Sequence, residues 1–303
     1  MKKKRLTVFW PLVFILPFII CFLLFNLFPI IYTFYTSFFD WDGMGPKKFV
    51  GLGNYIRAIT EDVNFRKSIL YTIRIMVLSI PCSILLGLVL AEFLSNLTRG
   101  KHVAQTINFL PYITTPVALG LMFSFFFDWS TGLINRLLIM FGLVDEGLNW
   151  LGSPKLAYIV VAIIIIWKNT GYYMAIYLAG ITSISQDVIE AARVDGATRT
   201  EVFWKIIVPL LKPITVFVTL TSIIAGLQLF DEPMLLFGKA GTVSAAGGPG
   251  RSCLSIIWNF YDVSFQTTSR LGYGSAIAIL LFVIIVISVM AGTKFINRGE
   301  KTK

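Results

Sequence analysis

Polar and charged residues interrupt the apolar stretches of this sequence at two places where they could bind a solute. Lys168 and Asn169 lie in the middle of one apolar run, and Gln228, Asp231 and Glu232 follow another. A charge within an apolar segment is costly unless it faces protein or water, so Lys168 is expected to reach an internal cavity or an acidic partner. Carboxylates beside aromatic rings could hydrogen-bond a polyhydroxylated ligand, and a solvated helix end is the alternative interpretation.

A second group of residues has the spacing of two short helices joined by a turn. Ser185 or Asp187 can cap the first helix, and Gly196 can supply the left-handed conformation that ends it. Thr198 and Glu201 have the Thr-x-x-Glu spacing of a capping box, so a second helix is expected to start at once. The sequence therefore predicts a short helix, a turn, and a helix that enters the next apolar segment.

The first of these short helices has side chains that suit a protein partner better than lipid. Its apolar side is expected to comprise Val188, Ile189 and Ala192, with Ala191 as a further candidate. Small alanines let a partner backbone approach closely, and Glu190 with Arg193 could fix the orientation through charged hydrogen bonds. An amphipathic helix on a membrane surface is the alternative, although Lys or Arg with bulky apolar residues would serve that role better.

The composition decides which solvent these elements face. Hydrophobic residues make up 56% of the chain, charged residues make up 14%, and the mean hydropathy is +0.78. Such a chain has too little polar surface to cover a soluble globule, so it is predicted to be an integral membrane protein. Several segments approach or exceed the roughly 20 apolar residues that cross a bilayer. They predict an all-α, polytopic fold of one domain, 1–303. The six predicted spans are at about 8–36, 69–91, 103–127, 156–181, 207–230 and 271–293, and the segment 185–209 lies between the fourth and the fifth.

The first apolar segment also resembles the start of a secretory signal peptide, because positive residues precede a hydrophobic run. However, the uncharged stretch from Leu6 to Phe39 is 34 residues long, and no small-x-small cleavage site closes it. We therefore predict a retained membrane span.

The positive charges predict the orientation of the chain in the membrane. With the N-terminus inside and six alternating spans, the inside segments are 1–5, 92–102, 182–212 and 294–303. They hold 14 Lys or Arg against 6 Asp or Glu, whereas the rest of the chain holds 12 against 10. Because Lys and Arg are retained on the cytoplasmic side, both termini are predicted to be cytoplasmic. The net charge of +10 then follows from topology and gives no support to nucleic-acid binding.

The sequence offers no metal site. Cys21, Cys82 and Cys253 lack the spacing of a ligand pair and are expected to pack, and His102 is expected in a solvated loop. Arg74 lies near the start of its predicted span, where it can reach outward, so a structural role is expected.

Prolines make several of the predicted spans irregular. They occur at positions 11, 17, 29, 81, 111, 116, 209 and 213. Each removes a backbone donor and can bend its helix, which lipid tolerates only where protein or water satisfies the freed carbonyl. Ordinary kinking between packed helices would explain any one of them, but together they favour a bundle that surrounds a cavity.

The segment 185–209 resembles the cytoplasmic coupling loop of ABC-importer transmembrane subunits. The resemblance rests on Glu190-Ala191-Ala192, Asp195-Gly196-Ala197, Phe203, Ile206 and Pro209. Other motifs resemble carbohydrate-importer permeases, in particular the first of the two sugar permeases in such systems. These motifs are Phe49 to Tyr55, Leu110-Pro111, Gly247-Gly248-Pro249 and Tyr273 to Ala276. The stretch from Phe237 to Gly247 departs from the pattern because it is longer than usual.

The resemblance implies a permease subunit of an ATP-driven importer, with a sugar, in particular an oligosaccharide, as substrate. The implied partners are a second homologous permease, two ATP-binding subunits and an extracellular solute-binding protein, assembled in a bacterial-type cytoplasmic membrane with its lipid. The chain itself is expected to be no enzyme and to hold no cofactor. ATP and Mg would bind to the partner subunits, because this sequence contains no Gly-x-x-x-x-Gly-Lys-[Ser/Thr] phosphate loop.

The resemblance also implies roles for individual residues. Coupling to the ATP-binding subunit would fall on Glu190, Ala191, Ala192, Asp195 and Gly196. The substrate pathway would include Lys168, Asn169, Gln228, Asp231, Glu232, Tyr273 and Ser275.

Three alternatives remain open from the sequence. The solute could be glycerol phosphate or an amino acid, although a phosphate would call for buried arginine. An ion-gradient-driven secondary transporter would also have kinked helices and polar residues at depth, but the coupling loop would be idle in it. A membrane sensor would not transport at all.

Overall fold

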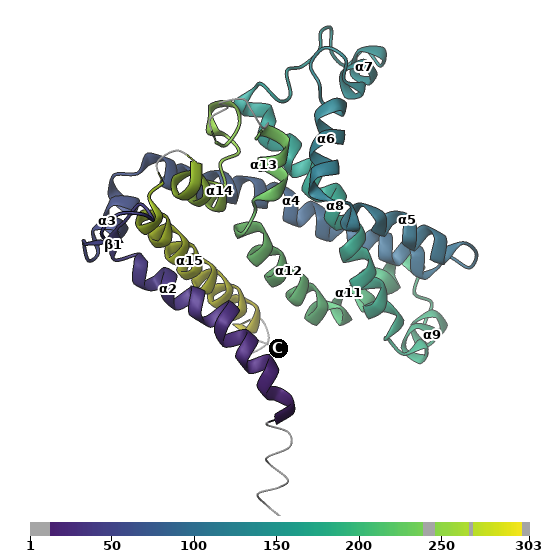
Figure 1. Ribbon diagram of the computed structural model, residues 1–303. Coiled ribbons are helices and arrows are strands. Elements are labelled where there is room, and N and C mark those ends of the chain that lie inside the picture. The colour runs from purple at the N-terminus through teal and green to yellow at the C-terminus, as the bar shows by residue number, and fades with distance from the viewer. Residues whose placement is uncertain (1–12, 239–245, 267–268, 299–303) are drawn as a thin grey trace, which may run out of the picture. The chain divides into compact units, whose positions relative to one another are not determined.

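The computed structural model describes residues 13–238, 246–266 and 269–298, with the side chains of the last range described as far as residue 294. Within these ranges the chain is helical apart from connecting loops and one short hairpin (Figure 1). It divides into two compact units. Unit 1 comprises the described residues up to 63 together with 260–283, and unit 2 comprises 64–259 together with the described residues from 284 onward.

Unit 1 contains the first predicted span and the start of the last one. Its elements are the π-helical turn η1 (Leu23–Leu27), α2 (Phe28–Thr36), β1 (Phe39–Asp40), β2 (Lys48–Phe49), α3 (Gly53–Thr60), the π-helical turn η4 (Asp262–Gln266) and the part of α15 (Leu271–Arg298) up to Val283. The two strands pair antiparallel, with Phe39 opposite Phe49. The side-chain amide of Asn54 donates to the carbonyls of Ser37 and Phe39, so α3 is tied to this hairpin.

Unit 2 contains the other four predicted spans and the segments that connect them. Its elements are α4 (Val63–Ser95), α5 (Lys101–Ile113), α6 (Pro116–Phe126), α7 (Leu133–Met140), α8 (Pro154–Thr182), α9 (Gln186–Val194), α10 (Arg199–Val202), the π-helical turn η2 (Phe203–Ile207), α11 (Val208–Leu210), α12 (Lys212–Leu227), α13 (Asp231–Phe237), the 3-10 turn η3 (Pro249–Arg251) and most of α14 (Ile256–Tyr261). In Figure 1, α5 crosses α8, and the short helix α13 lies beside α6.

Two apolar clusters hold unit 2 together. One joins α4 and α8 to α9 and the segment that follows it, and it includes the fully buried Met174, Tyr177 and Leu211. The other joins α4, α6, α8 and α13, and it includes Ile75 and Leu119. Because α8 contributes to both clusters, it is the helix against which the rest of the unit packs.

The predicted spans agree with the structure for four unbroken helices. Val13–Thr36, α4, α8 and Leu271–Lys294 are long and apolar enough to cross a membrane, and two bent helix pairs raise the number to as many as six within the described residues. Residues 8–12 of the first predicted span lie outside those residues. Pro81 lies inside α4 without ending it.

The third predicted span, 103–127, is wrong as a single helix. It consists of α5 and α6, which meet at an angle of 94°. Thr114 and Thr115 between them have extended backbone, with ψ of 136° and 139°. The residue before a proline is driven out of the helical region, so Pro116 forces the chain to leave one helix before it begins the next.

The fifth predicted span, 207–230, is also corrected. Its straight part is α12, and the preceding segment Arg199–Leu210 meets it at 64° beside Pro209 and Pro213. The helix ends at Leu227, and Phe230 has a non-helical conformation with φ of −145°. Asp231 and Glu232 therefore belong to the first turn of a separate short helix, α13, and not to the end of the span.

Candidate functional site

Unit 2 contains a cavity of about 360 Å³ between α4, α8, α12 and the start of α13. Five of the predicted substrate-pathway residues line it, namely Lys168, Asn169, Gln228, Asp231 and Glu232. Serine, threonine and tyrosine side chains line it as well, at Ser79, Ser83, Tyr112, Tyr172, Tyr173, Thr221 and Ser222. The cavity therefore combines hydroxyl groups, aromatic rings and three charged groups.

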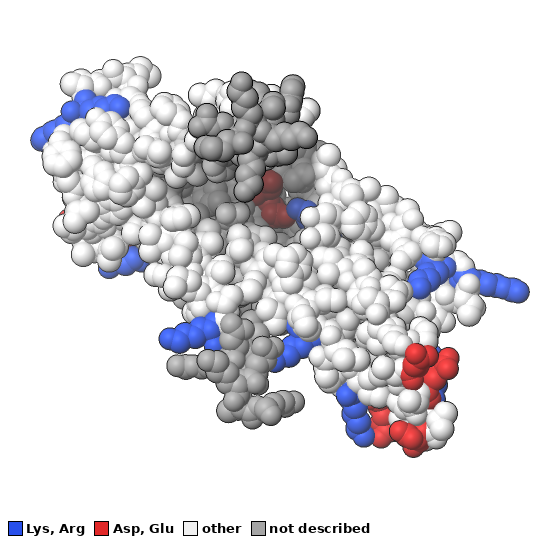
Figure 2. Space-filling view, turned by 90° about the horizontal axis from the view of Figure 1, so that it is seen from below, with Lys and Arg blue, Asp and Glu red and all other residues white. Residues whose placement is uncertain are grey.

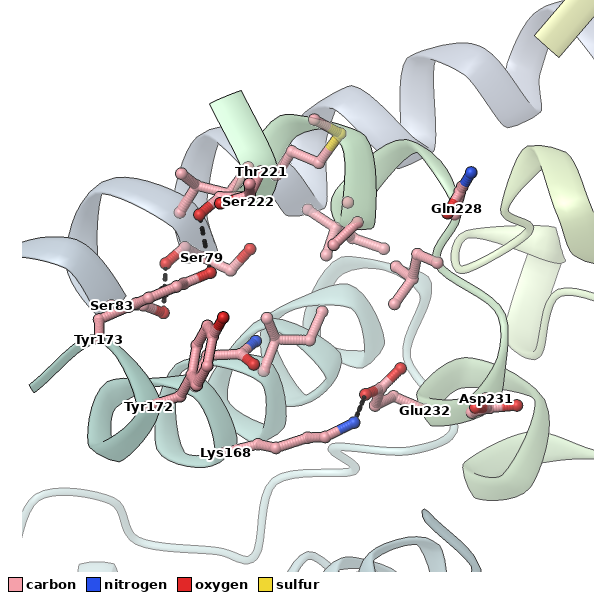
Figure 3. A pocket seen from close by; sticks show the side chains of 18 of the residues that line it. Ser79, Ser83, Lys168, Tyr172, Tyr173, Thr221, Ser222, Gln228, Asp231 and Glu232 are labelled. Carbon is pink, nitrogen blue, oxygen red and sulfur yellow. Dashed lines mark hydrogen bonds and ion pairs between the residues drawn. The ribbon is translucent and has the colours of Figure 1, made fainter. Parts of the chain in front are cut away.

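Lys168 forms an ion pair with Glu232 at the wall of this cavity. The Lys168 Nζ atom lies 2.7 Å from Glu232 Oε1, and the two side chains are 18% and 10% exposed. Figure 3 shows Glu232 reaching from α13 toward Lys168 on α8. Both alternatives for Lys168, a cavity and an acidic partner, are thus confirmed together, and a solvated helix end is wrong for Glu232.

The opposite wall carries hydroxyl groups held in fixed positions. Ser222 donates a hydrogen bond of 2.7 Å to the Tyr173 hydroxyl, which joins α12 to α8. On α4, Ser83 donates to the carbonyl of Ser79 at 2.8 Å. These bonds satisfy buried polar groups and keep oxygen atoms at the cavity wall, where they can also accept from a solute.

Two tyrosines form an aromatic surface on the same cavity. The rings of Tyr112 and Tyr172 stack with centroids 4.4 Å apart and planes 10° from parallel. Such a pair presents a flat apolar face beside the hydroxyls, which suits the apolar face of a sugar ring.

The remaining predicted pathway residues of unit 2 are less enclosed. Gln228 and Asp231 are exposed, and Asn169 is half-buried. In Figure 3 the side chain of Asp231 points away from the ion pair that its neighbour Glu232 makes. Arg74 does not line the cavity and instead donates to the Tyr158 hydroxyl at 3.1 Å, with its guanidinium 3.9 Å from the centre of that ring, in keeping with the structural role expected for it.

The last two predicted pathway residues belong to unit 1. The Tyr273 hydroxyl donates to Asp62 Oδ2 at 2.6 Å, and the Arg57 guanidinium lies 5.0 Å from its ring centre. Ser275 accepts a hydrogen bond of 2.9 Å from Thr36, which ties the start of α15 to α2. Their place in a substrate pathway remains a prediction.

The caps predicted for the segment 185–209 are confirmed. The Ser185 side chain accepts from the Asp187 backbone, so Ser185 is the residue that caps α9. Gly196 ends the helix region with φ of +85°. Thr198 and Glu201 form a complete capping box at the start of α10.

The helix α9 buries one face and exposes the other. Ile189 and Ala192 are 7% and 8% exposed and join the apolar cluster of α4 and α8. Val188 is 45% exposed, and Ala191 is also exposed, so of the predicted apolar side only Ile189 and Ala192 pack within this chain. A helix turns by about 100° per residue, so Ala191 points away from Ile189, whereas Val188 lies at the edge of the face that Ile189 and Ala192 form.

Most of the residues predicted for coupling are exposed, either on α9 or in the turn that follows it. Glu190, Ala191, Asp195 and Gly196 are exposed, and only Ala192 faces inward. Figure 2 shows a cluster of acidic side chains with basic side chains nearby. The segment 185–209 contains four Asp and Glu residues. The arrangement can bind another protein through small apolar and charged groups.

The sequence interpretation missed the hydroxyl-bearing wall of the cavity. Ser79 and Ser83 lie four positions apart in an apolar span, the spacing that puts two side chains on one helix face, and this signal could have been used. Tyr112 and Tyr172 come from different helices, and no local pattern indicates that they stack.

The packing expected for all three cysteines is confirmed for Cys253, whereas Cys21 is exposed, so packing within this chain is wrong for it. Cys253 is fully buried, and burial raises the pKa of its thiol to about 12. Within the described residues, no three His, Cys, Asp or Glu side chains come together as a possible metal site.

Comparison with known proteins assigns this chain to a family. The family model described as "Binding-protein-dependent transport system inner membrane component" matches residues 67–301. The lactose transport system permease protein LacF of Rhizobium radiobacter is 30% identical over 289 residues, which cover 95% of this chain and 93% of that protein. The trehalose/maltose transport system permease protein MalF of Thermococcus litoralis is 33% identical over 276 residues, covering 90% and 88%.

A solved structure shares the fold. A chain in the crystal structure of a bacterial ABC transporter involved in the import of the acidic polysaccharide alginate superposes with a TM-score of 0.82 at 24% identity, covering 97% of this chain and 98% of that one. The family match over most of the sequence, with relatives similar over nearly their full length, confirms the predicted permease assignment: the chain belongs to the family of binding-protein-dependent transport system inner membrane components, which are multi-pass transport permeases and not catalytic enzymes.

Proposed function

We propose that this chain is the permease subunit of an ATP-driven sugar importer, that it forms half of the translocation pathway, and that its substrate is an oligosaccharide. Two relatives similar over most of their length are named for the transport of lactose and of trehalose and maltose, and a third, from Bacillus subtilis, is named for arabinooligosaccharides. The cavity is consistent with such a solute, because hydroxyl groups and stacked tyrosines line it together.

The observation that carries the mechanism is that α9 packs one face against the rest of unit 2 and exposes the other. Ile189 and Ala192 anchor the helix to the cluster that includes α4 and α8, while Glu190 and Ala191 face outward. A partner that grips the outer face would move the anchored face with it, and α4 and α8 carry cavity residues. Force applied at α9 would thus reach the walls of the cavity.

The proposed assembly places the ATP chemistry in partner subunits. The chain lacks a phosphate loop, so two ATP-binding subunits are expected beneath it, one of which receives α9 in a cleft. A second homologous permease would complete the pathway, and an extracellular solute-binding protein would deliver the sugar. In this orientation both termini and the segment 185–209 face the cytoplasm, in agreement with the distribution of Lys and Arg.

Alternating access requires that nucleotide binding favour one state of the permease over the other. Closure of the ATP-binding subunits on ATP would displace α9 and turn the cavity from the cytoplasm toward the outside. Hydrolysis would then restore the first state and release the sugar inside.

The test is ATP-driven uptake by the complete transporter in liposomes, with its solute-binding protein and a panel of mono- and oligosaccharides. Glu190→Lys reverses a charge on the exposed face, and Gly196→Pro cannot keep a φ of +85° or the hydrogen bond from the Gly196 backbone to the Arg193 carbonyl. Both variants are expected to insert and assemble but to abolish uptake. Glu146→Lys, a matched charge reversal on an exposed loop between α7 and α8, is expected to transport normally.

Three results would contradict the proposal. Normal uptake by either coupling variant would remove the role of α9. Uptake that survives ATP depletion and collapses with an ionophore would indicate a secondary transporter. A complete complex that moves no solute at all would favour a sensor.

A further inference from the structure

We infer that the ion pair of Lys168 and Glu232 makes this cavity selective for uncharged solutes, so that sugars bearing a carboxylate or phosphate are rejected at this site. The inference rests on the proposed function, because it takes the cavity to be part of the sugar pathway. It concerns which class of sugar the cavity admits.

The first step is the charge of the cavity wall. Among the described residues that line it, the charged groups are Lys168, Asp231 and Glu232. Lys168 is thus the one cation among the described residues that line the cavity. Arg74 lies outside the cavity and donates to the Tyr158 hydroxyl. An anionic solute would meet two carboxylates and a single ammonium group.

The second step is that this ammonium group is already engaged. Lys168 Nζ lies 2.7 Å from Glu232 Oε1, and both side chains are largely shielded from water. In such surroundings a charged hydrogen bond is stronger than in water, and separating the pair would leave an uncompensated carboxylate. A uronate or a phosphate that reached Lys168 would therefore have to share its ammonium group with Glu232, whose negative charge repels it.

The third step is the chemistry of the other walls. Tyr112 and Tyr172 present aromatic faces, which carry partial negative charge and repel anions. Ser79, Ser83 and Ser222 offer hydroxyl groups that can accept from or donate to a neutral hydroxylated solute. These walls are therefore compatible with an uncharged sugar, and the one cation among the described lining residues is already paired.

The position of the pair explains why it can act on specificity. Lys168 comes from the long helix α8 and Glu232 from the short helix α13, so the bond crosses the cavity wall from one element to another (Figure 3). The neighbouring Asp231 is exposed and points away from Lys168, so it cannot replace Glu232 without a change in α13.

The experiment measures equilibrium binding of D-glucose and D-glucuronate to the purified transporter complex in nanodiscs, without the solute-binding protein, by ligand-observed NMR. The two sugars share a ring and differ in a hydroxymethyl against a carboxylate group. The wild-type complex is expected to bind glucose and to show no glucuronate binding. Glu232→Gln keeps the shape of the side chain but frees the ammonium group, so glucuronate affinity is expected to rise by about tenfold or more, the range of a charged hydrogen bond.

Three further variants separate the ion pair from a general effect of charge. Asp231→Asn removes a neighbouring carboxylate without freeing Lys168, so it is expected to raise glucuronate affinity far less than Glu232→Gln. The double variant Lys168→Gln with Glu232→Gln is expected to lose the gained affinity, because no cation remains. Glu146→Gln, the same substitution outside the cavity, is expected to bind glucose and to show no gain in glucuronate binding, as in the wild type. Glucose binding in each variant checks that the cavity is intact.

The outcomes distinguish this inference from the proposed function. Equal binding of glucose and glucuronate by the wild type, or an equal gain in Asp231→Asn and Glu232→Gln, would overturn the selectivity and leave the sugar importer standing. A gain that persists in the double variant would do the same. A wild-type complex that binds neither these sugars nor any oligosaccharide would overturn the sugar function, and the inference with it.

Discussion

Gly171 of α8 lies directly against the backbone carbonyl of Asn108 on α5, at the point where the two helices cross. A Cβ atom at position 171 would overlap that carbonyl and would also lie close to Phe109. The absence of a side chain therefore sets how near α5 can come to α8. This crossing lies beside the cavity, because Tyr112 on α5 reaches Tyr172 on α8 one turn further along.

Gly171→Ala is expected to destabilise the complex by about 1–3 kcal/mol, because a methyl group forced into a packed crossing must displace backbone. Loss of thermal stability in detergent, followed by size-exclusion fluorescence, measures the effect. Gly53→Ala is the matched control, since a Cβ there would make only ordinary contacts with Val50. Equal stability of the two variants would show that α5 is free to shift away from α8.

Gly196 is expected to accept only residues that tolerate left-handed backbone. Nothing lies within 4 Å of where its Cβ would be, so a substitution there acts through the φ of +85° and not through a clash. Gly196→Asn should keep most sugar-stimulated ATPase activity of the complete transporter, whereas Gly196→Val should lose most of it, because a β-branched residue is strained there. Similar activity in the two variants would show that coupling does not depend on this backbone conformation.

Asp128 is expected to stay ionised to unusually low pH. Its Oδ1 atom accepts hydrogen bonds from the backbone and side-chain groups of Ser130 and Thr131, at 2.8 to 3.0 Å. The Thr131 backbone is the largest of these influences, and together they lower the pKa of Asp128 from 3.8 to about 2. The ionised carboxylate therefore makes its full contribution to the stability of the turn when the pH is above the ordinary pKa of 3.8. This contribution is lost as the pH falls through about 2.

Titration of the Asp128 carboxyl carbon by NMR checks this value. Thr131→Val removes the hydroxyl donor and keeps the backbone donor, so the midpoint should rise but remain below 3.8. A midpoint in the variant identical to that of the wild type would show that the hydroxyl does not bind the carboxylate in solution.

Cys253 is expected to be inert toward thiol reagents while the protein is folded. The side chain is fully buried, and burial raises the pKa of its thiol to about 12, so almost no thiolate exists at neutral pH. In a variant carrying Cys21→Ser and Cys82→Ser, a maleimide should label Cys253 only after denaturation. Adding Glu146→Cys supplies an exposed thiol that should react at once, and rapid labelling of the folded protein without that change would contradict the packing seen here.

Local features of the segment 185–209 were predictable from the sequence because they depend on neighbours along the chain. Ser185, Gly196 and the capping box of Thr198 and Glu201 each act over four residues or fewer. The faces of α9 were less predictable. Val188 and Ile189 were both expected on the apolar side, yet only Ile189 is buried, because burial is decided by where the helix meets α4 and α8.

The sequence by itself determined that the chain is a membrane protein of long apolar helices, that Pro116, Pro209 and Pro213 disturb two of them, and that a capped helix precedes the fifth span. Apolar length, proline chemistry and caps are properties of the chain that need no distant partner. Only the tertiary structure decided that Lys168 pairs with Glu232, 64 residues further along the chain, and that Tyr112 stacks on Tyr172. Those contacts depend on the sharp bend after α5 and on the break after Leu227, which turn short helices toward α8, and no local pattern encodes where two turned helices meet.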